Sequence, residues 1–360
     1  MTFTVIGTPH DRRVGLFADA CRRLGLESPE VIAWRDVLRG EPIRIRPGTV
    51  LRIDSPGDDP ECDALLRGPG DPTRVGGGAR WYAAFTAALD RIAAAAAQAG
   101  ARSVSDPDEI AVMFDKRRCH ARLAAAGVPV PPALEGPVTG YASLREQMAR
   151  AGMSRVFVKP AHGSSGSGVV AFQAHRDRVK AVTSAVPGPD GRLHNSLRVR
   201  SVETEPEVAA LIDTLAPDGL HVERWFPKAA LGGRTLDLRV VVIDGVPTHA
   251  VVRTSRSPIT NLHMGGRRGD LDAVRAALGE SGWRHALRVC AEAAACFPGS
   301  RMVGVDLLVG LGWRRVAVAE VNAFGDLLPG LLGLPGTPAE GLDTYTAQIT
   351  AALSLKGTPA

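Results

Sequence analysis

The sequence has no apolar run long enough to cross a membrane. None of its 360 residues lies in an unbroken stretch of about 18 apolar residues, the length that a spanning helix needs. The apolar start at the amino terminus is short, so we see no signal peptide and expect a cytoplasmic protein. Apolar residues make up 45% and charged residues 22%, which excludes wholesale disorder and suits two or three domains.

Cysteine and lysine are both scarce. The five cysteines form no Cys-x-x-Cys pair, so we predict neither a zinc site nor a disulfide framework. Only five of the 43 basic residues are lysines, and the arginines are spread along the chain. The net charge of +5 therefore reflects composition, and we expect no nucleic-acid partner. The lysines are Lys116, Lys159, Lys180, Lys228 and Lys356.

Two common nucleotide-binding motifs are missing. No G-x-G-x-x-G follows the first predicted strand, at 3–6, so we predict no Rossmann dinucleotide site. The glycine-rich segment 159–169 (KPAHGSSGSGV) lacks the Gly-Lys-Ser/Thr ending of a Walker A loop.

The first hundred residues alternate between strand and helix patterns. β-Prone runs at 3–6, 31–34 and 50–53 are separated by an amphipathic helix at 12–24, and a long helix is predicted over 81–99. This alternation implies a small parallel α/β domain.

The rest of the chain mixes helices with antiparallel strands. Asp106, Pro107 and Glu109 supply a cap, a first-turn proline and a capping-box acid, and they predict one helix that runs to Ala126. Two β-prone stretches between Lys180 and Glu203 flank the turn 187–191 and predict a hairpin. Further helices are predicted at 143–151, 205–215, 270–278 and 283–296, and further strands at 156–158, 221–223, 303–308, 316–321 and on both sides of Asp244-Gly245.

The glycine-rich segment directly follows a predicted strand that ends in Lys159. Glycines let backbone N–H groups close around an anion, and serine hydroxyls add donors. Such a loop by itself is as often a flexible connector. The lysine favours phosphate binding, because it can reach the phosphates of a bound nucleotide.

Three polar residues interrupt the last two apolar strands. Glu320 and Asn322 are two apart on one strand and therefore face the same side. Asp306 can join them if the two strands pair through the turn 310–313. Two carboxylates and an amide oxygen are hard ligands suited to Mg²⁺. The alternative is a set of exposed strand positions.

In their joint order these motifs resemble the ATP-grasp ligases, over roughly residues 105–335. The branch that the chain is most similar to includes the ribosomal-protein glutamate ligases and the glutathione synthetases. The matching motifs are Asp115-Lys116 on a helix before 127–131, Lys159-Pro160 with its glycine loop, Glu223-Arg224-Trp225-Phe226, Asp237-Leu238-Arg239, Arg253, Asn261-Leu262-His263 with Gly265-Gly266, Asp306, and Glu320-Val321-Asn322.

The resemblance implies an α/β fold in three parts. A small amino-terminal parallel α/β domain (1–105) would precede a two-lobed ATP-grasp fold, with ATP between the lobes. The first lobe (106–222) would carry the glycine-rich loop, and the second (223–350) the metal site. The hairpin within 180–203 departs from the compact family pattern. It could shape substrate choice or be surface decoration, and we favour decoration.

The resemblance also implies roles for individual residues. ATP would be bound by two lysines, the glycine loop, the hinge and an acid for the ribose, which are Lys116, Lys159, Gly163, Ser164, Ser165, Gly166, Gly168, Glu223, Trp225 and Asp237. Arg253, Arg239 and Asn261 would serve catalysis, although salt bridges explain the arginines equally well. Asp306, Glu320 and Asn322 would hold Mg²⁺, with Mn²⁺ as an alternative. Roles for His162 and His263 stay open.

The implied reaction joins a carboxylate to an amine. ATP would phosphorylate the carboxylate, the amine would attack the acyl phosphate, and ADP and phosphate would be released. The partners would be small-molecule or peptide carboxylates and amines, with no membrane; the oligomeric state stays open. Two alternatives are a phosphotransferase of the same fold and a non-catalytic nucleotide-binding protein.

Overall fold

The amino-terminal elements form a small parallel α/β layer. The computed structural model describes residues 1–163, 166–176, 178–324 and 328–354, with the side chain of His263 left out. The strands are β1 (Phe3–Gly7), β2 (Glu30–Ala33), β3 (Val50–Ile53) and β4 (Arg102–Ser103), in the order β2-β1-β3-β4 and all parallel. The parallel sheet predicted for the first hundred residues is confirmed.

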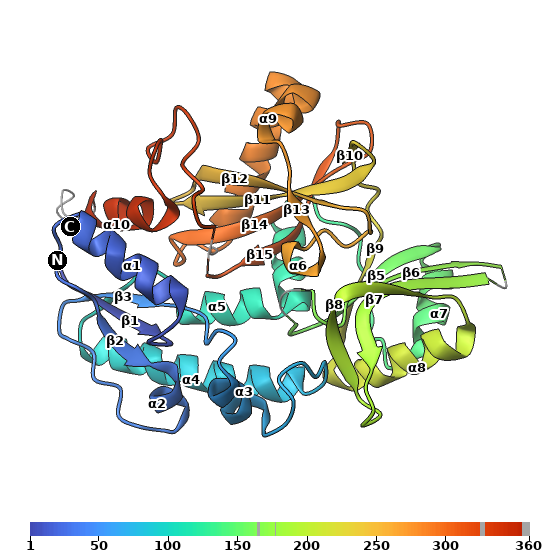
Figure 1. Cartoon of the computed structure of the whole chain (residues 1–360), viewed down its shortest axis with the longest axis horizontal. Coiled ribbons are helices and arrows are strands. Elements are labelled where there is room, and N and C mark those ends of the chain that lie inside the picture. Colours follow the sequence, from blue (N-terminus) through green and yellow to red (C-terminus); the bar gives the residue numbers. More distant parts are fainter. Residues whose placement is uncertain (164–165, 177, 325–327, 355–360) are drawn as a thin grey trace.

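Helices cover this sheet and extend away from it. They are α1 (Arg12–Arg23), α2 (Trp34–Leu38), α3 (Pro60–Arg67) and the long α4 (Gly78–Gln98). The last helix of the chain, α10 (Thr344–Ser354), returns to this end of the molecule and lies beside α1 (Figure 1). Tyr345 and Ile349 of α10 share a core with Phe3 and Phe17.

A five-stranded antiparallel sheet forms the green lobe in Figure 1. Its order is β8-β7-β6-β5-β9, with β5 (Arg155–Pro160), β6 (Val170–His175), β7 (Arg178–Pro187), β8 (Leu193–Val202) and β9 (Leu220–Arg224). The helices α7 (Tyr141–Arg150) and α8 (Glu205–Leu215) pack on it through an apolar core that includes Leu144, Phe172 and Ile212.

The third sheet carries the carboxyl-terminal strands. Its order is β13-β12-β11-β14-β15, with β10 beside β11. Its strands are β10 (Ala230–Leu231), β11 (Arg234–Ile243), β12 (Val246–Ser255), β13 (Arg267–Arg268), β14 (Met302–Val309) and β15 (Val316–Asn322). Both predicted hairpins of this region are present. Helix α9 (Leu271–Ala295) packs on the sheet and is kinked at Gly279, where the backbone is left-handed (φ 65°).

The prediction of one helix from Pro107 to Ala126 is wrong. The chain forms α5 (Pro107–Phe114) and α6 (Lys116–Ala125), separated by Asp115, whose backbone is extended. The Asp115 side chain accepts hydrogen bonds from the backbone N–H groups of Arg117 and Arg118, so it caps α6. A good capping residue inside an apolar pattern starts a second helix, and Lys116 becomes its first residue.

The β7–β8 hairpin is paired with another part of the chain. The Val75 N–H donates to the Leu193 carbonyl (2.8 Å), and the Asn195 N–H donates to the Thr73 carbonyl (2.7 Å). Its tip is therefore paired with the chain that links α3 to α4. The sequence patterns also missed α3, β6 and α10, and they placed Trp34 in a strand although it begins α2.

No helix in the described part of the chain is both long and apolar enough to cross a membrane.

Candidate functional site

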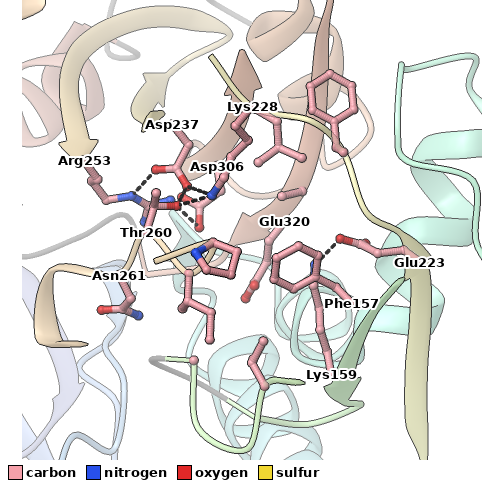
Figure 2. Close-up of a pocket in the computed structure, with 17 residues that line it drawn as sticks. Phe157, Lys159, Glu223, Lys228, Asp237, Arg253, Thr260, Asn261, Asp306 and Glu320 are labelled. Carbon is pink, nitrogen blue, oxygen red and sulfur yellow. Dashed lines mark hydrogen bonds and ion pairs between the residues drawn. The ribbon is translucent and has the colours of Figure 1, made fainter. Parts of the chain in front are cut away.

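A pocket lies between the five-stranded sheet and the carboxyl-terminal sheet, and charged side chains from both point into it (Figure 2). It receives β5 and β9 residues from one side, and β11, β12, β14 and β15 residues from the other. The lining residues are Phe157, Lys159, Gly166, Val169, Glu223, Phe226, Lys228, Asp237, Arg253, Pro258, Ile259, Thr260, Asn261, Asp306, Leu308, Ala319 and Glu320. The structure thus gathers many of the predicted site residues around one cavity.

Lys159 and Glu223 form a buried ion pair at the pocket wall that the five-stranded sheet supplies. Lys159 Nζ lies 2.6 Å from Glu223 Oε1, across the paired strands β5 and β9. Burial alone would disfavour both charges, but the pair reverses this: the pKa of Lys159 is raised, and that of Glu223 is lowered to about 2 by Lys159 and His221. Both groups are charged at neutral pH.

Asp237 is the centre of a second cluster, on the opposite wall. The Arg253 Nε–H donates to Asp237 Oδ1 (2.7 Å), and the Thr260 hydroxyl donates to Oδ2. Lys228 Nζ lies 3.8 Å from the same carboxylate and donates to the Thr260 hydroxyl at 2.7 Å. Figure 2 shows these side chains converging from β11, β12, the chain that follows β12 and, for Lys228, the chain between β9 and β10.

Asp306 is held by two guanidinium groups. Arg239 contacts it through Nε, and Arg253 Nη2 lies 3.2 Å from its Oδ2. Burial would raise the pKa of Asp306, but these two arginines lower it to about 2. In return, Asp237 and Asp306 raise the pKa of Arg253 above its ordinary value, against the effect of its own burial. Arg239 is not among the residues that line the pocket; it lies behind Asp306.

Lys116 joins the glycine-rich segment to the carboxyl-terminal sheet. Its Nζ donates to the Gly163 carbonyl and lies 3.5 Å from Glu320 Oε1. Asp115 fixes this lysine at the start of α6, whose first N–H donates to the Ala161 carbonyl (2.9 Å).

The described part of the glycine-rich segment is tightly packed. Gly166 and Gly168 have left-handed backbones (φ 72° and 67°), and a Cβ on Gly168 would come within 2.5 Å of Val75 Cγ1. Side chains are therefore disfavoured at both positions. Ser164 and Ser165, predicted phosphate donors, lie outside the described residues.

The backbone N–H groups of the predicted hinge have partners within the chain. Arg224 N–H donates to the Pro132 carbonyl (2.7 Å), and Trp225 N–H donates to the Arg155 carbonyl (3.0 Å). The Trp225 ring packs on Phe157, with 5.2 Å between ring centroids, and does not line the pocket. A ligand would therefore meet the Glu223 side chain and the Phe157 ring in this region rather than those two N–H groups.

The sequence left roles for His162 and His263 open, and the structure describes the side chain of His162. His162 is buried against Tyr82, with the two rings stacked 4.0 Å apart, and burial lowers its pKa. It is not among the lining residues and serves to anchor the segment that leads into the glycines. The His263 side chain is not described.

The sequence patterns missed Lys228, Thr260 and Phe226 as pocket residues. Lys228 is almost wholly buried; burial lowers its pKa to about 8, and Asp237 compensates only in part. The rarity of lysine that singled out Lys116 and Lys159 applies to Lys228 as well, and was the one available signal.

The predicted metal ligands lie at one end of β14 and β15. The antiparallel register sets Asp306 opposite Glu320, and Asn322 opposite Gly304, whose carbonyl accepts from Asn322 Nδ2 (3.1 Å). Among the described residues, no group of three or more His, Cys, Asp and Glu side chains could hold a metal ion. Asp306 and Glu320, with the amide oxygen of Asn322, offer hard oxygen donors, and this donor chemistry fits Mg²⁺ with phosphate and water as further ligands.

The chain resembles solved structures over almost its whole length. D-cycloserine synthetase DcsG is 19% identical, with a TM-score of 0.56 and coverage of 98% of this chain and 99% of that one. The ATP-grasp ligase PsnB, complexed with a minimal precursor, is 18% identical, with a TM-score of 0.56 and 99% of each chain covered. The macrocyclase MdnC from Microcystis aeruginosa MRC, bound to the precursor peptide MdnA, is 12% identical, with a TM-score of 0.54 and coverage of 99% and 100%.

Sequence comparison alone gives no assignment. No protein-family model matches the chain, and no curated protein does so. The structural likeness nevertheless identifies the architecture: the chain has the α/β ATP-grasp fold.

Proposed function

We propose that this ATP-grasp chain is an ATP-dependent ligase that joins a carboxylate to an amine. The observation that carries the proposal is the gathering of opposite charges around one pocket. Lys159, Lys228 and Arg253 face the same cavity as Asp306 and Glu320, and Lys116 reaches its edge. Cations suit the phosphates of ATP, and the paired acids suit the metal that accompanies them.

The nucleotide would lie between the two sheets. Phe157, Phe226 and Leu308 supply apolar surface for the base, and Lys159 supplies a positive charge beside it. Lys116 and the backbone of Gly163, Gly166 and Gly168 would meet the phosphates, with Ser164 and Ser165 as further candidates. Asp237 remains our candidate for the ribose hydroxyls. Glu223 is the alternative, and in both acids each carboxylate oxygen already has a partner within the chain.

Asp306, Glu320 and Asn322 would hold Mg²⁺, or Mn²⁺ as an alternative. The metal would supply charge neutralisation between phosphate oxygens. PsnB has been solved with Mg and ADP at 18% identity and a TM-score of 0.54, which supports this choice of cofactors. Arg239 and Arg253 keep Asp306 ionised, so the carboxylate is ready to act as a ligand at neutral pH.

The chemistry would rest on position and charge rather than on a protein nucleophile. A carboxylate oxygen of the substrate attacks the γ-phosphorus, the bond to ADP breaks, and an acyl phosphate forms. The amine nitrogen then attacks the carbonyl carbon, phosphate leaves, and the surplus amine proton passes to solvent. Arg253, supported by Arg239, would stabilise charge on the transferring group, and Asn261 would border the acceptor.

The names of the structural neighbours support two substrate classes. D-cycloserine synthetase is named for a small-molecule product, whereas PsnB and MdnC were solved with precursor peptides. We therefore propose small-molecule or peptide carboxylates and amines as substrates, without a nucleic-acid or membrane partner. Cytoplasmic localisation remains our prediction.

The test is a screen of paired carboxylates and amines with ATP and Mg²⁺. We expect carboxylate-dependent release of ADP and phosphate, and a hydroxamate when hydroxylamine replaces the amine, because hydroxylamine traps an acyl phosphate. Release of AMP and pyrophosphate would contradict the mechanism. A stable phosphorylated product that forms without an amine would favour the phosphotransferase instead.

A further inference from the structure

His221 lies behind the Lys159–Glu223 pair, outside the pocket. It is directly opposite Lys159 in the β5–β9 register and two residues before Glu223 on β9, so both β9 side chains face the same way. Its residue exposure is only 5%, and it is not among the described residues that line the pocket. Any effect of His221 on a bound ligand must pass through its neighbours.

Both carboxylate oxygens of Glu223 are engaged, by different partners. Oε1 lies 2.6 Å from Lys159 Nζ, and Oε2 lies 3.1 Å from His221 Nε2. Burial lowers the pKa of His221, so the ring is neutral at neutral pH. An ionised carboxylate only accepts hydrogen bonds, so Nε2 carries the proton and donates it to Glu223. The carboxylate is thereby held at two points.

A second histidine fixes His221 from the other side. The His120 and His221 rings lie 4.9 Å apart, and the His120 Nε2–H donates to the Pro131 carbonyl at 2.8 Å. His120 lies on α6, four residues after Lys116 and therefore on the same face of that helix. The two histidines connect the helix that begins with Lys116 to the strand that carries Glu223.

We propose that His221 is a positioning residue of the nucleotide site: it holds Glu223 so that Lys159 is presented to the pocket. This inference rests on the proposed function, because it assigns Lys159 to the nucleotide. Without the His221 N–H, Glu223 Oε2 would be a buried acceptor with no donor. The carboxylate would then turn both oxygens towards Lys159 and draw the ammonium group away from the ligand.

Three variants of the full chain test the proposal. His221→Leu removes the donor, and His221→Gln keeps a side-chain N–H. His249→Leu is the matched control, because His249 is as deeply buried (0% exposed) but bonds to the Leu342 carbonyl, away from the pocket. The probe is a non-hydrolysable ATP analogue with Mg²⁺, and its affinity is measured by calorimetry.

We expect His221→Leu to bind the analogue about tenfold more weakly, as for a lost hydrogen bond to a charged group. His221→Gln and His249→Leu should stay within about threefold of the wild type.

Wild-type affinity in His221→Leu would overturn the inference, as would an equal loss in His249→Leu or a failure of His221→Gln to restore binding. If the wild-type chain itself does not bind the analogue, the proposed function fails together with this inference. The two failures are therefore distinguishable.

Discussion

Asp306 and Glu320 lie directly opposite each other on the antiparallel strands β14 and β15, and both line the same pocket. Two acids in this relationship would repel each other without compensating cations. Arg239 and Arg253 compensate Asp306, and Lys116 lies beside Glu320. This compensation supports our proposal that the site takes a polyanion together with its metal.

Replacement of either acid is expected to stop turnover. Asp306→Asn and Glu320→Gln keep the shape of the side chain and remove the charge, so we expect at least about a hundredfold loss of phosphate release at saturating ATP. Added Mn²⁺ should restore activity in neither variant. Chelation of Mg²⁺ should abolish activity in the wild type. Full activity in either variant would contradict the metal assignment.

Lys228→Met should weaken nucleotide binding without loss of stability. Lys228 has a pKa of about 8, below the ordinary lysine value, so its charge costs free energy in the folded state at neutral pH. Because the folded state binds fewer protons than the unfolded state between about pH 8 and pH 10.5, Lys228 makes stability rise with pH across that window.

The measurement is the free energy of unfolding of wild type and Lys228→Met at several pH values. We expect the variant to be at least as stable at pH 7, and the wild type to gain relative to it as the pH rises through the window. Lys180→Met is the control, because Lys180 forms an exposed pair with Glu203. A pH-independent difference between wild type and Lys228→Met would contradict the low pKa.

Arg253→Met should destabilise the fold and abolish activity together. Arg253 bridges the buried Asp237 and the largely buried Asp306, and its removal leaves both carboxylates with less compensation. Breaking a buried pair in this way typically costs about 3–5 kcal/mol. Denaturant unfolding measures the cost. Arg150→Met, at an exposed pair with Glu146, should change stability by less than about 1 kcal/mol.

Asp115→Ala should affect the site through the start of α6. Loss of an N-cap costs about 1 kcal/mol, and here the capped helix begins with Lys116. We expect weaker binding of a non-hydrolysable ATP analogue in addition to the lower stability. Asp106→Ala is the control, because it removes the corresponding cap of α5. There the Glu109 N–H donates to Asp106 Oδ1 at 3.0 Å. Equal nucleotide affinity in the two variants would show that the cap next to Lys116 has no special role.

Local patterns predicted most strands and long helices because their apolar periodicity is strong. The prediction of a single helix over 107–126 failed at Asp115, because the apolar periodicity continues across this residue although its side chain caps a second helix. Two helices were missed. Helix α3 is too short for a clear periodicity, and the apolar residues of α10 indicate a buried face only once its partner α1 is known.

The site residues also divide into those that local sequence patterns indicate and those that only the fold brings together. Asp306, Glu320 and Lys159 interrupt apolar strands and could be found from the sequence. Lys228 and Thr260 lie on irregular chain, and only the folded sheet brings them to Asp237. The sequence suggested that the N–H groups of Arg224 and Trp225 were available to a ligand. In the fold these groups donate to the carbonyls of Pro132 and Arg155, which are distant along the chain.

The pairing of the β7–β8 hairpin with residues 73–75 restricts how the molecule can open. The five-stranded sheet cannot move away from the linker between α3 and α4 without breaking the hydrogen bonds from Val75 to Leu193 and from Asn195 to Thr73. While those bonds persist, that sheet and this linker travel as one body. Any rotation of that sheet relative to the carboxyl-terminal sheet would therefore also move residues 73–75, which lead into α4.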